Sequence, residues 1–179
     1  YDFHIGDFNK LLIRLSLKMA HLNIFVSESQ RKYYAQTYRL SQNTKQVVVY
    51  NGINFSKLKL RIENADLSDP KEPNIFFSLA MVGNFVPVRD QMTVCRFLDL
   101  LSRKRINYNF LFIGRKDENN PKLYDECITF CSANGIKDKV LFCGTRPDVP
   151  SLLHQLDAFI YSTDHDTFGL AVIEAIATG

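Results

Sequence analysis

The stretch LDAFIYSTDHDTFGLAVIEAIATG, residues 156–179, carries the pattern that decides the fold. Its apolar run at 157–162 predicts a buried strand, and the residues from Leu170 onward predict a helix. The turn between the two holds Asp166, and Glu174 lies eight residues later, about two turns into the helix. A pair of acids around a strand-to-helix turn is the feature that a function for this chain has to explain.

The same strand-then-helix order repeats upstream. Apolar strands are predicted at 76–83, 108–114 and 139–144, and the helices that follow them at 90–104, 120–134 and near 148–155. Apolar strands that alternate with helices are typical of a parallel sheet covered on both faces. The sequence therefore predicts an α/β fold with a Rossmann-like parallel sheet.

Three of the predicted strands end in glycine, at Gly83, Gly114 and Gly144. An α/β sheet of this kind holds its ligand at the carboxyl ends of the strands. Neither the dinucleotide pattern G-x-G-x-x-G nor the P-loop pattern follows any strand. A dehydrogenase and a P-loop NTPase are both disfavoured.

The first part of the chain predicts a second, incomplete α/β domain. Helix 7–21 is amphipathic, and strands are predicted at 22–27 and 46–54, with a helix from Glu28 that Ser27 caps. We interpret 1–50 as the remnant of an N-terminal domain, 51–73 as an interdomain segment and loop, and 74–179 as a domain that lacks its last strands. The chain looks like a piece of a longer protein.

Helix 7–21 has an apolar face and a basic one. The apolar face carries Phe8, Leu11, Leu12, Leu15 and Met19, and the basic stripe carries Lys10, Arg14, Lys18 and His21. Such a helix either meets an anionic lipid surface or packs against the rest of a domain, with its basic face in solvent. Both alternatives stay open at this point.

Composition excludes several classes of protein. The chain has 179 residues, of which 46% are hydrophobic and 23% charged, and a net charge of +3, so nothing favours a nucleic-acid partner. No apolar segment reaches the roughly 20 residues of a membrane span, and no secretory signal opens the chain, so we expect a cytoplasmic protein. The cysteines lack a second ligand pair at metal-binding spacing and predict reduced core thiols: Cys95, Cys127, Cys131 and Cys143.

Four segments in order resemble the retaining, group 1 (family 4) glycosyltransferases of the GT-B fold. FVSES (25–29) is similar to the end of their first domain, and VVVYNGIN (47–54) to their interdomain segment. MVGNFVPVRD (81–90) is similar to their G-R-x-x-x-x-K-G turn. DTFGLAVIEAIATG (166–179) is similar to their E-G-F-G-L-x-x-x-E-A-x-A-x-G signature and aligns without a gap.

The resemblance assigns roles in binding a nucleotide diphosphate sugar, the donor. It implies that Glu174 accepts hydrogen bonds from the ribose hydroxyls and that Asp166 faces the transferred sugar. The amides at the start of the last helix suit the diphosphate, because a helix N-terminus favours anions. This cradle comprises Asp166, Thr167, Phe168, Gly169, Leu170 and Glu174.

Arg89 is expected to neutralise the leaving diphosphate, from the turn that begins at Gly83. Here Asn84 replaces the family's arginine, and Asp90 replaces a glycine. The Gly144-Thr145-Arg146 turn lies where the family surrounds the nucleobase, although a surface arginine explains Arg146 equally well. His4, in YDFHIGD, resembles the histidine that reaches the reacting sugar.

The resemblance implies an enzyme that moves a sugar from UDP- or GDP-sugar to a sugar, lipid-linked sugar or other hydroxyl acceptor, with retention, in polysaccharide or glycolipid biosynthesis. His4, Asp166 and Arg89 are the expected catalytic residues, and no metal or cofactor is expected. The alternatives are a non-catalytic nucleotide-sugar-binding module, which Asn84 and Asp166 leave open, and a GT-B nucleotide-sugar epimerase. We expect the protein in the cytoplasm, with peripheral contact at the inner face of a membrane through helix 7–21 as one alternative.

Overall fold

The protein is represented by a computed structural model that describes residues 6–41, 44–63 and 76–179. Contacts divide the chain into two units. The first holds the chain up to Gly52 together with Asp166–Gly169, and the second holds Ile53–His165 and Leu170–Gly179.

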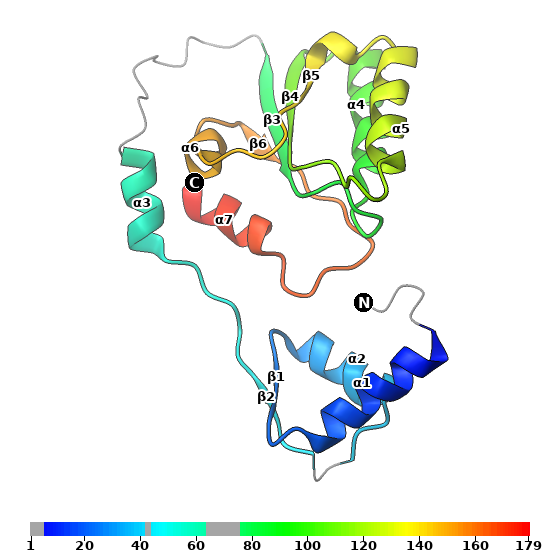
Figure 1. The fold of residues 1–179 in the computed structure, drawn as a ribbon. Helices are drawn as coiled ribbons and strands as arrows, with labels where there is room; N and C mark the ends of the chain where they lie inside the picture. Colours follow the sequence, from blue (N-terminus) through cyan, green and yellow to red (C-terminus); the bar gives the residue numbers. More distant parts are fainter. Residues whose placement is uncertain (1–5, 42–43, 64–75) are drawn as a thin grey trace. The chain divides into compact units, whose positions relative to one another are not determined.

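The first unit contains two helices and a two-stranded parallel sheet (Figure 1). Its elements are α1 (Asp7–Met19), β1 (Asn23–Phe25), α2 (Glu28–Thr37) and β2 (Gln46–Val48). The predicted cap of α2 is confirmed, because the Ser27 hydroxyl accepts a hydrogen bond from the Gln30 N–H at 3.1 Å. Phe25 and Tyr38 are buried in this unit.

Helix α1 leaves its apolar face in solvent. Phe8 and Met19, near its two ends, are 72% and 80% exposed, and Leu11, Leu12 and Leu15 are also exposed. The basic residues differ from the predicted stripe in one respect. Lys10, Lys18 and His21 are exposed, whereas Arg14 is only half-exposed, and its buried Nε has no hydrogen-bond partner among the described residues.

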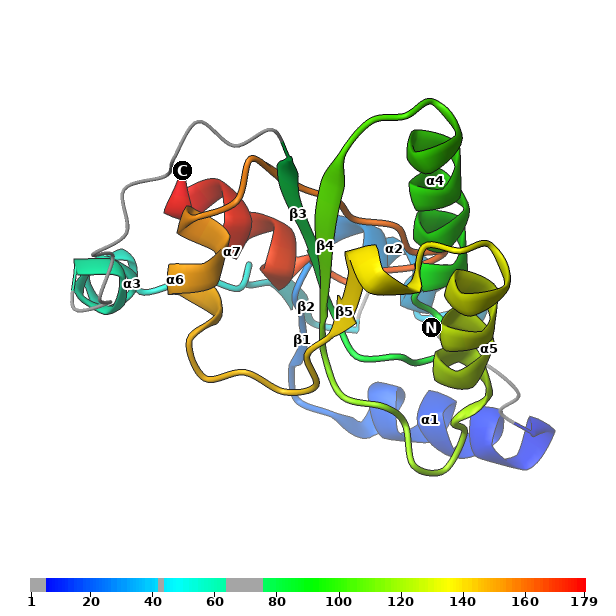
Figure 2. The ribbon, with the colours of Figure 1, turned by 90° about the horizontal axis from the view of Figure 1, so that it is seen from above.

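The second unit is a four-stranded parallel sheet with helices on both faces, which confirms the predicted fold class. The strand order is β5-β4-β3-β6. In Figure 2, α4 and α5 lie on one side of β3 and β4, and α6 and α7 on the other. The strands are β3 (Phe77–Val82), β4 (Tyr108–Ile113), β5 (Val140–Phe142) and β6 (Ala158–Phe159), and the helices are α4 (Gln91–Arg103), α5 (Lys122–Ala133), the short 3-10 helix η1 (Lys137–Lys139), α6 (Val149–His154) and α7 (Leu170–Thr178).

One helix of this unit was not predicted. Helix α3 (Phe55–Glu63) lies within the range interpreted as interdomain segment and loop. The Asn54 carboxamide oxygen accepts a hydrogen bond from the Lys57 N–H at 2.9 Å, as a capping residue does. The helix buries Leu58 and packs against α6 and α7.

The main core lies between the sheet and the α4–α5 layer. β3 contributes Leu79 and Met81, and β4 contributes Tyr108, Phe110 and Phe112. The rings of Phe110 and Phe112 meet edge to face with centroids 4.7 Å apart. Burying one such side chain stabilises the fold by about 1.5–3 kcal/mol, so this layer contributes much of the stability of the sheet.

Three of the cysteines lie in this core, as predicted. Cys95, Cys127 and Cys131 are fully buried, and the sulfur atoms of Cys95 and Cys131 are 3.9 Å apart. Cys143 differs from the prediction because it is only half-buried, just after β5. All four are free thiols, and the described residues contain no group of three or more side chains suited to holding a metal ion.

No helix within the described ranges combines the length and the apolar character that a membrane span requires.

Candidate functional site

The three strand-ending glycines lie next to one another along the carboxyl edge of the sheet. The Gly114 N–H donates a hydrogen bond to the Gly144 carbonyl at 2.9 Å, and the Gly83 N–H donates to the Ile113 carbonyl at the same distance. A Cβ added to Gly114 would lie 2.1 Å from the Gly83 carbonyl oxygen. Gly144 adopts a φ of +63°, which favours glycine. The sheet edge is therefore closely packed and nearly bare of side chains at these points.

The turn after β3 is fixed from two sides. The Asn84 Oδ1 accepts a hydrogen bond from the Arg115 N–H at 3.1 Å, and the Phe85 N–H donates to the Arg115 carbonyl at 3.0 Å. From inside, the buried Gln91 amide donates through Nε2 to the Asn84 carbonyl at 3.0 Å and lies 3.4 Å from the Gly83 carbonyl. Asn84 thus joins the turn after β3 to the one after β4.

Sequence reasoning missed Gln91. The signal that could have found it is a polar residue at the first position of a helix whose later inward positions, Val94, Cys95 and Leu98, are apolar. Its Oε1 is buried without a hydrogen-bond partner among the described residues.

The Arg89 side chain runs back over Gly83, where an added Cβ would meet its Nε at 3.6 Å. Its guanidinium stacks on the ring of Tyr161, with Cζ 5.1 Å from the ring centroid, and Nη1 donates a hydrogen bond to the Tyr161 hydroxyl. Nη1 also lies 3.4 Å from the Thr163 hydroxyl oxygen. Arg89 is therefore held at the start of the glycine-lined edge by residues from the segment that follows β6. Tyr161 was not predicted to take part.

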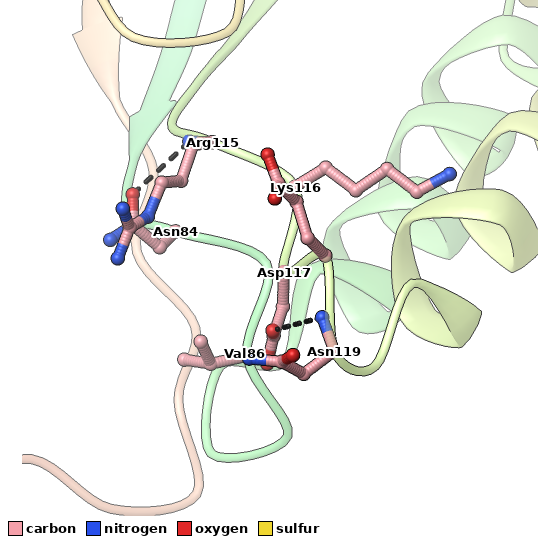
Figure 3. A pocket seen from close by; sticks show the side chains of 7 residues that line it. Asn84, Val86, Arg115, Lys116, Asp117 and Asn119 are labelled. Atoms are coloured by element: carbon pink, nitrogen blue, oxygen red, sulfur yellow. Dashed lines mark hydrogen bonds between the residues drawn. The ribbon is translucent and has the colours of Figure 1, made fainter.

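A cavity of about 250 Å³ opens beside this turn (Figure 3). It is lined by Asn84 and Val86 from the β3–α4 turn and by residues 115–119 from the β4–α5 loop. The Lys116 ammonium points away from it and pairs with Asp125 at 2.7 Å. The structure thus places a polar hollow next to two of the three strand-ending glycines.

The turn after β5 presents two exposed side chains, Thr145 and Arg146. Arg146 forms a bidentate ion pair with Asp148, with distances of 2.8 and 2.6 Å. This hydrogen-bonded pair raises the pKa of Arg146 and lowers that of Asp148. The resemblance assigns this turn to the nucleobase chiefly through backbone groups, so the ion pair leaves that assignment a prediction.

The predicted acidic pair falls into both units. In the first unit, the Asp166 Oδ1 accepts a hydrogen bond from the Thr167 N–H at 2.7 Å, and the Phe168 ring lies 6.1 Å from the Tyr50 ring. In the second unit, Glu174 is half-buried on α7, and its carboxylate makes no hydrogen bond or ion pair with any described residue.

Gly169 and Leu170 lie at the predicted start of the last helix. Gly169 has a φ of +76°, a left-handed conformation, and α7 begins at Leu170. His4, the remaining predicted site residue, lies outside the described residues.

The sequence profile of the family described as glycosyl transferases group 1 matches residues 63–179, more than half of the chain. The chain belongs to this family of group 1 glycosyltransferases. The match covers the glycine-lined edge, Arg89 and Glu174 alike.

Two relatives of known function are similar over most of the chain. One is the Campylobacter jejuni N,N'-diacetylbacillosaminyl-diphospho-undecaprenol alpha-1,3-N-acetylgalactosaminyltransferase, 26% identical over 94% of this chain and 43% of the relative. The other is the Rhizobium meliloti lipopolysaccharide core biosynthesis mannosyltransferase LpsB, 24% identical over 94% of this chain and 53% of the relative. The chain thus spans about half the length of these relatives.

A solved structure shows the same fold. Anabaena HepE, determined in complex with UDP and glucose, superposes with a TM-score of 0.77 at 19% identity, over 98% of this chain and 47% of HepE. The group 1 glycosyltransferase therefore has the α/β architecture of its GT-B relatives, as the sequence predicted.

Proposed function

We propose that this group 1 glycosyltransferase moves a sugar from UDP- or GDP-sugar to an acceptor hydroxyl, with retention at the anomeric carbon. The observation that carries the proposal is Arg89, stacked on Tyr161 across Gly83 at the start of the glycine-lined edge. A nucleoside diphosphate leaves with concentrated negative charge, and a fixed cation stabilises that charge without having to reorganise. The proposed reaction uses no metal ion or organic cofactor.

The bonds that change are few. The bond between the anomeric carbon and the β-phosphate oxygen breaks, and the diphosphate leaves with the electron pair. The acceptor oxygen forms the new bond on the same face, and its proton passes to the leaving phosphate. Arg89 supplies charge stabilisation for the first of these events.

The remaining roles are proposed from the family pattern. Glu174, half-buried and without a described partner, is suited to accept hydrogen bonds from two ribose hydroxyls, because a carboxylate has several lone pairs. Asp166 and His4 are assigned to the transferred sugar. The amides of Gly169 and Leu170 are assigned to the diphosphate, because those of Thr167 and Phe168 donate to the Asp166 carboxylate, and the turn at Gly144, Thr145 and Arg146 is assigned to the base.

The acceptor is proposed as a sugar or lipid-linked sugar in polysaccharide or glycolipid biosynthesis. The Campylobacter relative is named for a diphospho-undecaprenol-linked sugar, and the Rhizobium relative for lipopolysaccharide core biosynthesis. HepE was crystallised with UDP and glucose, which favours UDP as the nucleotide.

Calorimetric titration of the protein with UDP, GDP and ADP tests the donor site. We expect saturable binding of UDP or GDP that is weakened by Arg89→Ala, whereas Arg96→Ala, on the exposed side of α4, serves as the matched control. Absence of binding by all three nucleotides contradicts the proposal.

A transfer assay separates the alternatives. A binding module would bind nucleotide without transferring sugar, and an epimerase would release an epimerised sugar nucleotide without any acceptor. A glycosylated acceptor supports the transferase.

We also propose that α1 contacts an anionic membrane surface, where lipid-linked acceptors reside. Its exposed apolar face, with Phe8 and Met19 near the two ends, is flanked by the exposed cations Lys10 and Lys18. An amphipathic helix of this composition lies in a membrane interface through both kinds of contact.

Co-sedimentation with phosphatidylglycerol-containing vesicles tests this contact. We expect binding to fall when Lys10→Glu and Lys18→Glu are combined, and also in Phe8→Ser. Arg14 is left unchanged because its half-buried side chain contributes to the first unit. Lys104→Glu, which removes one cation elsewhere, is the control. Equal binding of all variants, or equal binding to neutral vesicles, contradicts the proposal.

A further inference from the structure

Two loops of the second unit lie side by side although they are more than 70 residues apart in the chain. One runs from Val86 to Asp90 and carries Arg89, and the other runs from Ser162 to His165 and leads toward the acidic signature. Their backbones are joined by hydrogen bonds from the Asp90 N–H to the Ser162 carbonyl at 3.2 Å and from the Asp164 N–H to the Val88 carbonyl at 3.1 Å. Arg89 and Thr163 form an antiparallel bridge between them.

Asp90 adds a side-chain connection with both of its carboxylate oxygens. Oδ1 accepts a hydrogen bond from the Thr93 N–H at 3.1 Å and so caps α4. Oδ2 accepts a hydrogen bond from the Ser162 hydroxyl at 3.1 Å. Burial raises the pKa of Asp90, but the hydrogen bonds from Thr93 and Ser162 outweigh it and the pKa is lowered. The carboxylate therefore stays charged while it joins the helix to the second loop.

Thr163 reinforces the same junction. Its hydroxyl lies 2.7 Å from the Val88 carbonyl and 2.9 Å from the His165 carbonyl, and it donates its one proton to either of them. Arg89 donates to the same hydroxyl at 3.4 Å. The position of Arg89 thus depends on both loops.

We infer that Asp90 is a positioning residue, which locks the Arg89 loop to the Ser162–His165 loop and so fixes the two sides of the donor site in one geometry. The inference rests on the proposed function only in calling this a donor site. The family pattern has glycine at this position, which has no side-chain oxygen to accept a hydrogen bond from the Thr93 N–H or the Ser162 hydroxyl. Asp90 therefore adds a connection that the glycine of the pattern cannot make.

Two variants separate this role from ordinary helix capping. Asp90→Ser keeps a good capping oxygen but has no second oxygen for Ser162. Ser162→Ala removes the same hydrogen bond from the other loop and leaves the cap intact. Asp90→Asn is the conservative control, because its Oδ1 can cap α4 and its Nδ2 can donate to the Ser162 hydroxyl oxygen.

Hydrogen–deuterium exchange tests the connection without any ligand. We expect Ser162→Ala to speed exchange of the amides at 88–90, and Asp90→Ser to speed exchange at 162–164, with Asp90→Asn close to the unaltered protein. Faster exchange confined to the substituted loop overturns the inference.

Nucleotide affinity is the second measurement. We expect Asp90→Ser and Ser162→Ala each to weaken binding by about fivefold, and the double variant to be no weaker than either single variant, because one interaction is removed in all three. Unchanged affinity in folded variants, or losses that multiply, overturns the inference. If the unaltered protein binds no nucleotide, the proposed function fails, whereas the exchange experiment still decides the connection between the loops.

Discussion

Gly114 shows how a single missing Cβ shapes the candidate site. In Gly114→Ala the new carbon would lie 2.1 Å from the Gly83 carbonyl oxygen and 2.9 Å from the Asn84 nitrogen, both backbone atoms. Since a strand edge cannot yield as a flexible side chain does, we expect a loss of about 1–3 kcal/mol in the free energy of unfolding. Urea unfolding provides the measurement. Gly52→Ala, with no atom within 4 Å of the added carbon, should change stability far less.

Glu174 is the residue that we expect to bind the ribose of the nucleotide. If Glu174 holds the ribose, Glu174→Gln replaces a charge-assisted hydrogen bond with a neutral one and should weaken nucleotide binding by about 1–3 kcal/mol. Calorimetry with UDP and GDP measures the loss, and Glu126→Gln, on the outer side of α5, is the matched control. An affinity that the Glu174 substitution leaves unaltered would mean that the ribose binds elsewhere.

The sequence indicated which residues to inspect at the site but not what holds them. Gly83, Gly114 and Gly144 could be placed at one sheet edge because parallel strands share a carboxyl end. The stacking of Arg89 on Tyr161, and the pairing of Arg146 with Asp148, depend on side-chain rotamers and on contacts between distant segments. A linear pattern does not encode those.

At the scale of elements, Tyr108 joins β4 to α4. Its buried hydroxyl donates a hydrogen bond to the Leu98 carbonyl at 2.9 Å, and burial raises its pKa from 10 to about 12. The unfolded chain loses this proton first, so the stabilisation is complete below about pH 10 and is lost as the pH rises through about 12. We expect the unfolding midpoint to fall across that window.

Tyr108→Phe supplies the comparison for this pH dependence. The variant should be less stable at neutral pH, because the Leu98 carbonyl loses its donor, by about 1 kcal/mol. It should also lose stability less steeply above about pH 10. Urea unfolding of both proteins at several pH values measures this difference. If the free energy of unfolding falls with pH equally steeply in both, the pH dependence does not come from Tyr108.

The elements that the sequence predicted well are those whose apolar pattern is long. Strands expected at 76–83 and 108–114 occur as Phe77–Val82 and Tyr108–Ile113. The last strand was predicted at 157–162, but the observed strand is only Ala158–Phe159. Beyond it, Ser162 and Thr163 form hydrogen bonds to the β3–α4 loop instead. Helix α3 was not predicted, because a helix of nine residues that buries a single leucine shows little apolar periodicity in the sequence.

At the scale of the whole molecule, the chain consists of two units, and the proposed donor contacts are unevenly divided between them. Gly83, Arg89, Gly144 and Glu174 belong to the second unit, whereas Asp166–Gly169 group with the first. A ligand that binds only the folded state stabilises it by an amount that grows with the logarithm of the ligand concentration, about 2.7 kcal/mol at one hundred times the dissociation constant. We expect the slowing of amide exchange to be greatest in the segments that contact the ligand.

Hydrogen–deuterium exchange with and without saturating UDP or GDP shows which segments the nucleotide contacts. We expect slower exchange in the turns at 83–90 and 162–170 and along α7, because the nucleotide would restrain the loop that carries Arg89 and the helix that carries Glu174. Residues 23–25 and 46–48, the paired strands of the first unit, should exchange at nearly unchanged rates. Protection confined to those strands would place the nucleotide away from the glycine-lined edge, and the role assigned to Arg89 would then have to be abandoned.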